Sequence, residues 1–222
     1  MPEIQQRTFQ VPLECDYLLE PPLTPSATSI TAVTLHGYGQ TPEEFLPLTR
    51  RMLGPDHAIA ALRGPHPLRL KPFTTETAIG YNWGAPPHNW ERSKRLHHDI
   101  LAAVLADLKS LGAPKPVLVA FSQPVSLNYR FVREYPDAVA GVIGLCGGVS
   151  KDWEDLKVPN VQVPILHIAR SEDEYYPEEK ARQFESRLRS RSDSTVDFHM
   201  LPGKHRFPSQ AGEIVARWLT SV

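Results

Sequence analysis

Short apolar runs alternate with longer amphipathic segments along most of this chain. Continuous runs of aliphatic and β-branched residues are typical of strands buried on both faces of a parallel sheet. Such runs predict strands at 29–35, 57–62, 116–121, 139–145, 165–169 and 196–201. Apolar residues at helical spacing predict helices at 42–53, 92–111 and 123–132, from 177 onward and around 214–219. Residues 6–19 alternate polar and apolar residues, which predicts an antiparallel hairpin at a sheet edge.

Local signals mark the ends of two of these helices. Residues 41–44, Thr-Pro-Glu-Glu, form a capping box with proline at the first helical position. Gly112 ends the longest helix. Strands that alternate with helices through short loops predict an α/β protein, with a mostly parallel twisted sheet and helices on both faces. No composition shift marks a domain boundary, so we expect one domain over 1–222.

The segment 63–92 departs from this pattern, because it is rich in proline and has no steady period. An irregular stretch of that length in a compact domain is usually functional, which predicts a pocket wall or lid. Its aromatic residues, together with a tyrosine near position 173, are the candidate pocket residues: Tyr81, Trp83, Trp90 and Tyr176. Aromatic packing of the loop onto the sheet explains them equally well. The sequence favours neither interpretation.

Ser122 lies where the predicted strand 116–121 meets a predicted helix. A serine at such a junction projects from the carboxyl edge of the sheet, beside the first N–H groups of the helix. This placement is typical of the nucleophile of a hydrolase. A serine at a strand end can equally be a simple helix cap, so its importance depends on partners elsewhere in the chain.

Two further strands end beside suitable partners for Ser122. Asp173 follows the strand 165–169, and His205 follows the strand 196–201. The order Ser, Asp, His is that of the α/β-hydrolase fold. Glu172 is the main rival for the acidic position, because spacing alone does not fix geometry. The sequence therefore predicts a triad of Ser122, Asp173 and His205.

Composition narrows the classes of partner and cofactor. The chain has 24 basic and 25 acidic residues and no block of like charge, so we expect no nucleic-acid partner. No apolar run approaches ~18 residues, so we expect no membrane insertion. Cys15 and Cys146 are interpreted as reduced thiols of a cytoplasmic protein. The cluster 97–99, His-His-Asp, is interpreted as a solvated helix face, so no metal site is expected.

With these residues in place, the chain resembles the phospholipase/carboxylesterase group of α/β-hydrolases, which includes acyl-protein thioesterases and small bacterial carboxylesterases. The shared motifs are LHGYG at 35–39, FSQ at 121–123, DEYYP at 173–177 and GKH at 203–205. The resemblance implies Ser122 as nucleophile, with Asp173 and His205 as its partners. It also implies an oxyanion hole made by the backbone N–H groups of Tyr38 and Gln123. The expected substrates are small carboxylic esters or thioesters, and no cofactor is required.

The chain departs from the family pattern at the elbow, where Gly-x-Ser-x-Gly is replaced by Ala-Phe-Ser-Gln-Pro at 120–124. Pro124 suits the start of a helix, but it restricts Gln123, the residue before it. The departure from the family pattern therefore affects the backbone of Gln123, the predicted oxyanion donor. Two functions follow: a serine carboxylesterase, or a hydrolase-fold binding protein whose catalysis is weakened or lost through Pro124.

Overall fold

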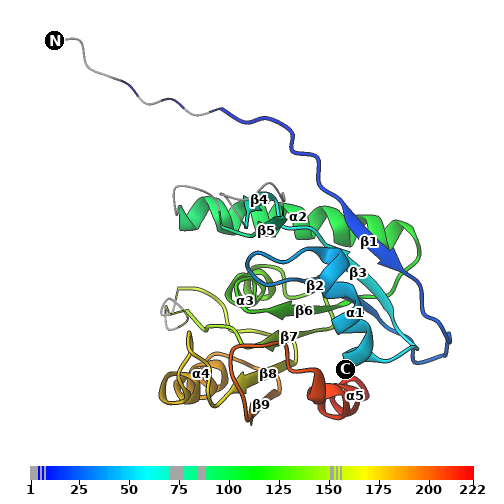
Figure 1. Ribbon diagram of the computed structural model, residues 1–222, viewed down its shortest axis with the longest axis vertical. Coiled ribbons are helices and arrows are strands. Elements are labelled where there is room, and N and C mark those ends of the chain that lie inside the picture. The colour runs from blue at the N-terminus through cyan, green and yellow to red at the C-terminus, as the bar shows by residue number, and fades with distance from the viewer. Residues whose placement is uncertain are drawn as a thin grey trace.

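A seven-stranded twisted sheet organises the chain (Figure 1). The computed structural model describes residues 5, 7, 9–70, 78–84, 89–150, 153, 155 and 157–222. The strands in spatial order are β1 Tyr17–Glu20, β3 Ala58–Leu62, β2 Thr31–Leu35, β6 Val117–Phe121, β7 Gly141–Leu145, β8 Ile165–Arg170 and β9 Val196–Leu201. Only β1 is antiparallel to its neighbour. The carboxyl ends of the other six strands therefore share one edge.

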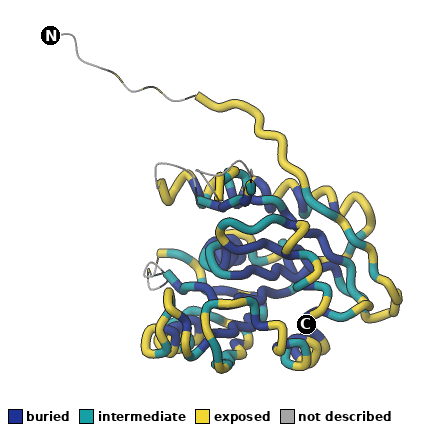
Figure 2. The backbone as a smooth tube through the Cα atoms, viewed as in Figure 1, coloured by how far each residue is buried: buried dark blue, intermediate teal, exposed yellow. Residues whose placement is uncertain are grey.

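Helices cover both faces of this sheet (Figure 1). Three of them pack into one core cluster: α2 Trp90–Ser110, α3 Val125–Glu134 and α4 Glu178–Ser190. The opposite cluster contains α1 Pro42–Leu53 and α5 Gly212–Leu219, the latter preceded by a 3₁₀ turn at Ser209–Ala211. The five inner strands are buried between these layers, whereas the edge strands β1 and β9 are only partly buried (Figure 2). The predicted α/β architecture is confirmed. In the described part of the chain, no helix is long and apolar enough to cross a membrane.

Elements set by local signals lie where the sequence predicts them. Helix α1 spans 42–53 as expected, and Thr41 and Glu44 exchange both hydrogen bonds of the capping box. Helix α2 begins two residues before its predicted start, because Asn89 accepts a hydrogen bond from the Arg92 N–H and caps it. Helix α3 begins at Val125 rather than 123, with Pro124 at its N-cap.

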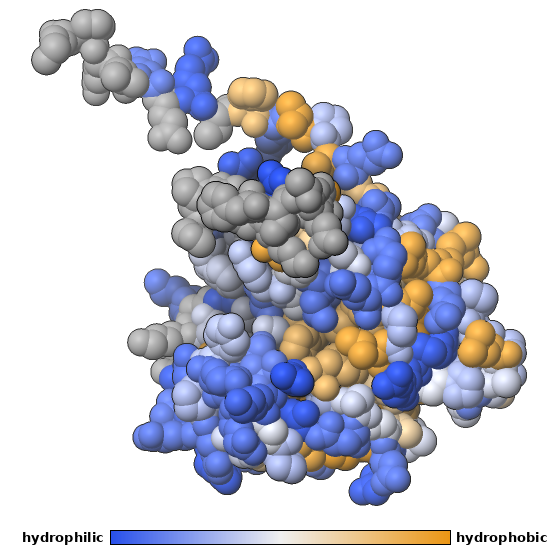
Figure 3. Space-filling model, in the orientation of Figure 1, coloured by the Kyte–Doolittle hydropathy of each residue, from blue (hydrophilic) through white to orange (hydrophobic). Residues whose placement is uncertain are grey.

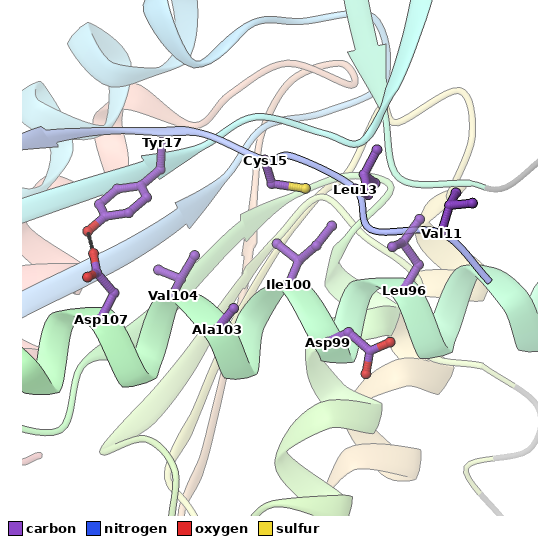
Figure 4. Close-up of a pocket in the computed structure, with 10 residues that line it drawn as sticks. All are labelled: Val11, Leu13, Cys15, Tyr17, Leu96, Asp99, Ile100, Ala103, Val104 and Asp107. Carbon is purple, nitrogen blue, oxygen red and sulfur yellow. Dashed lines mark hydrogen bonds between the residues drawn. The ribbon is translucent and has the colours of Figure 1, made fainter.

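The predicted hairpin at 6–19 is wrong. Only 17–20 forms a strand, and this strand pairs with β3, Tyr17 opposite Leu62. Alternation predicts a half-buried strand but not its partner, and the segment has no hairpin turn signal. Residues 9–16 instead run as extended chain along α2, with a cavity of about 480 Å³ between them (Figure 4). Residues 6 and 8 lie outside the described residues.

The segment 63–92 is more regular than predicted. It contains a two-stranded antiparallel sheet, β4 His66–Arg69 and β5 Ile79–Asn82, and α2 already begins at 90. Backbone hydrogen bonds in both directions join Tyr81 to the turn at Gly39 and Gln40. A Cβ on Gly80 would lie 2.0 Å from the Gly39 carbonyl oxygen, so this approach requires glycine. Residues 71–77 and 85–88 lie outside the described residues.

Candidate active site

Ser122 occupies a strained turn between β6 and α3. Its φ is +62°, in the left-handed region that residues other than glycine rarely adopt. The Ser122 N–H donates to the Leu145 carbonyl at 2.8 Å, so the turn is tied to the end of β7. The Ser122 carbonyl accepts from the Val125 N–H at 3.3 Å. Pro124, with φ of −77°, fits the turn into the helix, so the elbow forms without the usual flanking glycines.

The structure brings Ser122, His205 and Asp173 together in one hydrogen-bonded chain. Ser122 Oγ lies 2.8 Å from His205 Nε2, and His205 Nδ1 lies 2.7 Å from Asp173 Oδ2. The three residues follow β6, β9 and β8, whose carboxyl ends share one edge of the sheet. With the carboxylate as acceptor, the Nδ1 position carries the proton. Nε2 is then left to accept a proton from the serine hydroxyl.

Asp173 is held in place from two sides. Its side chain is buried, and Oδ1 accepts the backbone N–H groups of Tyr175 and Tyr176 at 2.8 and 2.9 Å. These bonds direct the other carboxylate oxygen toward the imidazole. Glu172, its rival in the sequence, is exposed, and none of the hydrogen bonds among the described residues joins its carboxylate to His205. The geometry favours Asp173.

Two charged residues that sequence reasoning missed hold the loop that carries His205. Glu174 Oε2 accepts the backbone N–H of His205 at 3.0 Å, and this bond is the main cause that lowers the pKa of Glu174. Buried Arg170 donates to the Pro202 carbonyl at 2.7 Å and packs beneath Gly203, whose φ is +121°. The place of each residue in the sequence could have indicated that it lies near the site, because Arg170 ends β8 and Glu174 directly follows Asp173.

Two backbone donors, the N–H groups of Tyr38 and Gln123, are expected at an oxyanion hole. Among the described residues, neither the Tyr38 N–H nor the Gln123 N–H makes a hydrogen bond. Their neighbours differ: the Gly37 N–H donates to Gln40 Oε1 at 2.8 Å, and the Gly39 N–H donates to the Tyr81 carbonyl at 2.8 Å. Tyr38 and Gln123 therefore keep donors available for a ligand.

The Gln123 side chain ties the elbow to the segment after β5. Gln123 Oε1 accepts the Trp83 N–H at 3.0 Å, and the Trp83 indole N–H donates to the His36 carbonyl at 2.9 Å. His36 Nε2 in turn accepts the Gly64 N–H at 3.0 Å, and burial lowers the pKa of His36. His36 therefore acts as a neutral structural link. No local pattern predicts this network, because its members lie far apart along the chain.

The four candidate pocket residues divide into two groups. Trp83 is only 1% exposed and packs in the core, which favours packing of the segment onto the sheet over a pocket wall for this residue. Tyr81 is half-buried on β5, with the Arg63 guanidinium 4.9 Å from its ring centroid. Trp90 and Tyr176 do line a common groove, of about 610 Å³, at the side of α3 and α4. Tertiary packing decides which of these aromatic residues line the groove. Their positions in the sequence do not distinguish them.

The histidine cluster is buried, which corrects the expectation of a solvated helix face. His97 Nε2 lies 3.0 Å from Asn128 Oδ1, and His98 Nδ1 lies 2.7 Å from the Lys94 carbonyl. Burial lowers the pKa of both rings. Within the described residues, no group of three or more histidine, cysteine or acidic side chains is placed to hold a metal ion.

No protein-family model matches the chain, and no curated protein matches its sequence. Solved structures do match. A carboxylesterase from Mesorhizobium loti has a TM-score of 0.76 at 20% identity, covering 97% of this chain and 99% of that one. Esterase PE8 has a TM-score of 0.72 at 22% identity, covering 95% and 100%.

A third match is a phospholipase/carboxylesterase from Dyadobacter fermentans, with a TM-score of 0.68 at 16% identity, covering 95% of this chain and 99% of that one. Likeness over almost the whole of both chains shows that the protein has the α/β-hydrolase fold. The structure thus resembles the group that the motifs indicated. At these identities the likeness establishes the fold, and the chemistry depends on the side chains of the site itself.

Proposed function

We propose that the protein is a serine hydrolase that cleaves carboxylic esters or thioesters through an acyl-enzyme intermediate on Ser122. The observation that carries the proposal is the hydrogen-bonded chain from Ser122 through His205 to Asp173. A serine hydroxyl is a weak nucleophile unless a base lies within hydrogen-bond reach. Here the base lies 2.8 Å away, and a buried carboxylate fixes its tautomer.

In the first half of the reaction, Ser122 Oγ attacks the carbonyl carbon and His205 Nε2 takes the hydroxyl proton. His205 then gives this proton to the leaving alcohol or thiol as its bond to the carbonyl carbon breaks. In the second half, water attacks the acyl carbon, and His205 accepts its proton and returns it to Ser122 Oγ. The carboxylic acid leaves and the enzyme is restored. Asp173 stabilises the imidazolium in both halves.

The backbone N–H groups of Tyr38 and Gln123 are proposed to stabilise the negative charge on the tetrahedral intermediate. Each unpaired donor of this kind contributes about 2.7–4 kcal/mol to the transition state. The support is that both donors are unused within the described part of the chain.

The cysteines Cys15 and Cys146 are both free, which fits the cytoplasmic location that we propose.

Labelling with a fluorophosphonate tests the proposal, because these reagents react with an activated serine. We expect one label per protein, located on Ser122 by peptide mass spectrometry, together with hydrolysis of short 4-nitrophenyl esters. Ser122→Ala should abolish both while its circular dichroism spectrum stays unchanged. A folded parent protein that neither takes the label nor hydrolyses any ester would favour the binding-protein alternative.

A further inference from the structure

The segment 81–83 is hydrogen-bonded to both turns that carry the proposed oxyanion donors. At the elbow, Gln123 Oε1 accepts the backbone N–H of Trp83 at 3.0 Å. At the turn 36–40, the His36 carbonyl accepts the indole N–H of Trp83 at 2.9 Å. Trp83 therefore joins the elbow to this turn, with its backbone bonded to one and its side chain to the other.

Backbone hydrogen bonds to the same segment hold the turn 36–40. The Gly39 N–H donates to the Tyr81 carbonyl at 2.8 Å, and the Tyr81 N–H donates to the Gln40 carbonyl at 3.0 Å. Tyr38, which carries the proposed donor, is 64% exposed, so packing of its side chain contributes little to the shape of the turn. The direction of the Tyr38 N–H therefore depends on where the neighbouring segment holds the turn.

Trp83 is itself held in place by packing. Its ring is buried and lies against the rings of His36 and His97, with centroids 5.5 and 5.9 Å away. His36 is bonded on both sides, because Nε2 accepts the Gly64 N–H at 3.0 Å and Nδ1 donates to the Gly37 carbonyl at 2.8 Å. A closely packed interior leaves such a ring little room to move. The two N–H groups of Trp83 therefore keep a fixed separation between the elbow and the turn.

We propose that the side-chain amide of Gln123 is a positioning group, which aligns the two oxyanion donors with each other through Trp83. The inference rests on the proposed function and names what holds its oxyanion site. Both N–H groups must point at one oxygen atom, about 2.7–3.1 Å away, before the reaction begins. Because Pro124 restricts the Gln123 backbone, this donor has little freedom to rotate toward the oxyanion. The bond to Trp83 fixes its place relative to the Tyr38 N–H instead.

The test compares 4-nitrophenyl butyrate with the thionoester in which sulfur replaces its carbonyl oxygen. Both substrates have the same acyl chain and leaving group, but sulfur is a larger atom and a weaker hydrogen-bond acceptor. The ratio of kcat/KM for the ester to that for the thionoester therefore reports how well the donors are aligned. A loss of folded protein lowers both values equally and leaves this ratio unchanged. For the parent protein we expect the ester to be preferred.

Two variants break the connection at its two ends. Gln123→Met removes the acceptor oxygen but keeps the backbone N–H. We expect kcat for the ester to fall about tenfold with KM near the parent value, less than the loss of a whole donor, and the ratio to fall about fivefold. Trp83→Phe removes the indole N–H and should lower the ratio in the same way. In the double variant the ratio should fall by less than the product of the two single effects, because both changes break one connection.

Gln162→Met is the matched control for the loss of a glutamine hydrogen bond. Gln162 Nε2 donates to Asp193 Oδ2 at 2.6 Å, just after α4. Around α4 the visible surface is hydrophilic (Figure 3), and this bond is exposed. The ratio for Gln162→Met should equal that of the parent protein.

An unchanged ratio in Gln123→Met would overturn the inference even if kcat fell, as would a parent protein that does not prefer the ester. If Gln123→Met does not fold, by its circular dichroism spectrum, an unchanged ratio in Trp83→Phe overturns the inference instead. The proposed function survives each of these results as long as the parent hydrolyses the ester and takes the fluorophosphonate label on Ser122. A parent that does neither would overturn the proposed function and this inference together.

Discussion

At the scale of single residues, the candidate site depends on which of three neighbouring acids faces the imidazole. Asp173 is buried and bonded to His205 Nδ1, whereas Glu172 is exposed and Glu174 bonds the backbone of His205. Asp173→Asn should lower kcat by about ten-thousand-fold, because an amide holds the wrong tautomer of the base. Glu172→Gln should leave kcat close to the parent value. Steady-state kinetics of both variants decide the assignment, and a severe effect of Glu172→Gln would reverse it.

We expect Glu174 to act as a positioning residue rather than a catalytic one. Its carboxylate holds the loop through the His205 backbone N–H at 3.0 Å. Glu174→Ala should lower kcat several-fold with little change in KM, because the base is displaced while the substrate-binding surface stays intact. Glu174→Gln keeps an acceptor oxygen and should restore most of the activity. Equal losses in the two variants would show that the charge, and not the hydrogen bond, is what matters.

At the scale of elements, Pro124 at the start of α3 restricts the backbone of Gln123, the proposed oxyanion donor. Pro124→Gly frees Gln123 from the restriction that a following proline imposes, so its N–H can align better with the oxyanion. We expect kcat to rise with KM unchanged, and stability to fall by about 0.4–1 kcal/mol. Pro136→Gly, in the loop after α3, controls for the general effect of losing a proline. An unchanged or lower kcat in a stably folded variant would show that proline permits full catalysis.

Two tryptophans from the same region are expected to differ in role. Trp83 is 1% exposed and bonds to the His36 carbonyl, so Trp83→Ala should cost about 3–5 kcal/mol of stability. Trp90 is 40% exposed and lines the groove, so Trp90→Ala should cost about 1 kcal/mol or less. Trp90→Ala should instead change the preference among acyl chain lengths. Urea unfolding and a panel of esters, measured on both variants, separate the two roles.

The sequence predicts best those elements that are determined by residues close together in the chain. The capping box at Thr41 and the apolar residues of β9 specify their structure locally, so the bounds of both elements agree with the prediction. The pairing of β4 with β5 and of β1 with β3 depends on residues far apart in the chain. The same limit applies to the candidate site. Strand ends placed Ser122, Asp173 and His205 on one edge, whereas the groove between α3 and α4 required the packed helices.

At the scale of the whole molecule, buried neutral histidines link stability to pH. Burial lowers the pKa of His97 and of His167 to about 3. In the unfolded chain both rings titrate near 6.5, so from about pH 6.5 down to 3 the unfolded state binds more protons. Stability should therefore fall with falling pH, by up to about 1.4 kcal/mol per pH unit for each ring.

Urea unfolding between pH 7.5 and about 5 measures this slope. His97→Gln removes one titrating ring and keeps a hydrogen-bonding side chain beside Asn128, so the pH slope should decrease by about one proton. A variant with the same slope as the parent would place the pH sensitivity elsewhere.

The order of the strands also determines when the candidate site can exist. The proposed nucleophile follows β6, in the middle of the sheet, but the proposed acid and base follow β8 and β9, in the part of the sheet formed by the last third of the chain. Until β8 docks, the fully buried run of β7 is an open sheet edge that can pair with another chain. Parallel pairing of distant segments is slow. In refolding, recovery of activity will therefore lag behind recovery of helix, and its yield will fall as protein concentration rises.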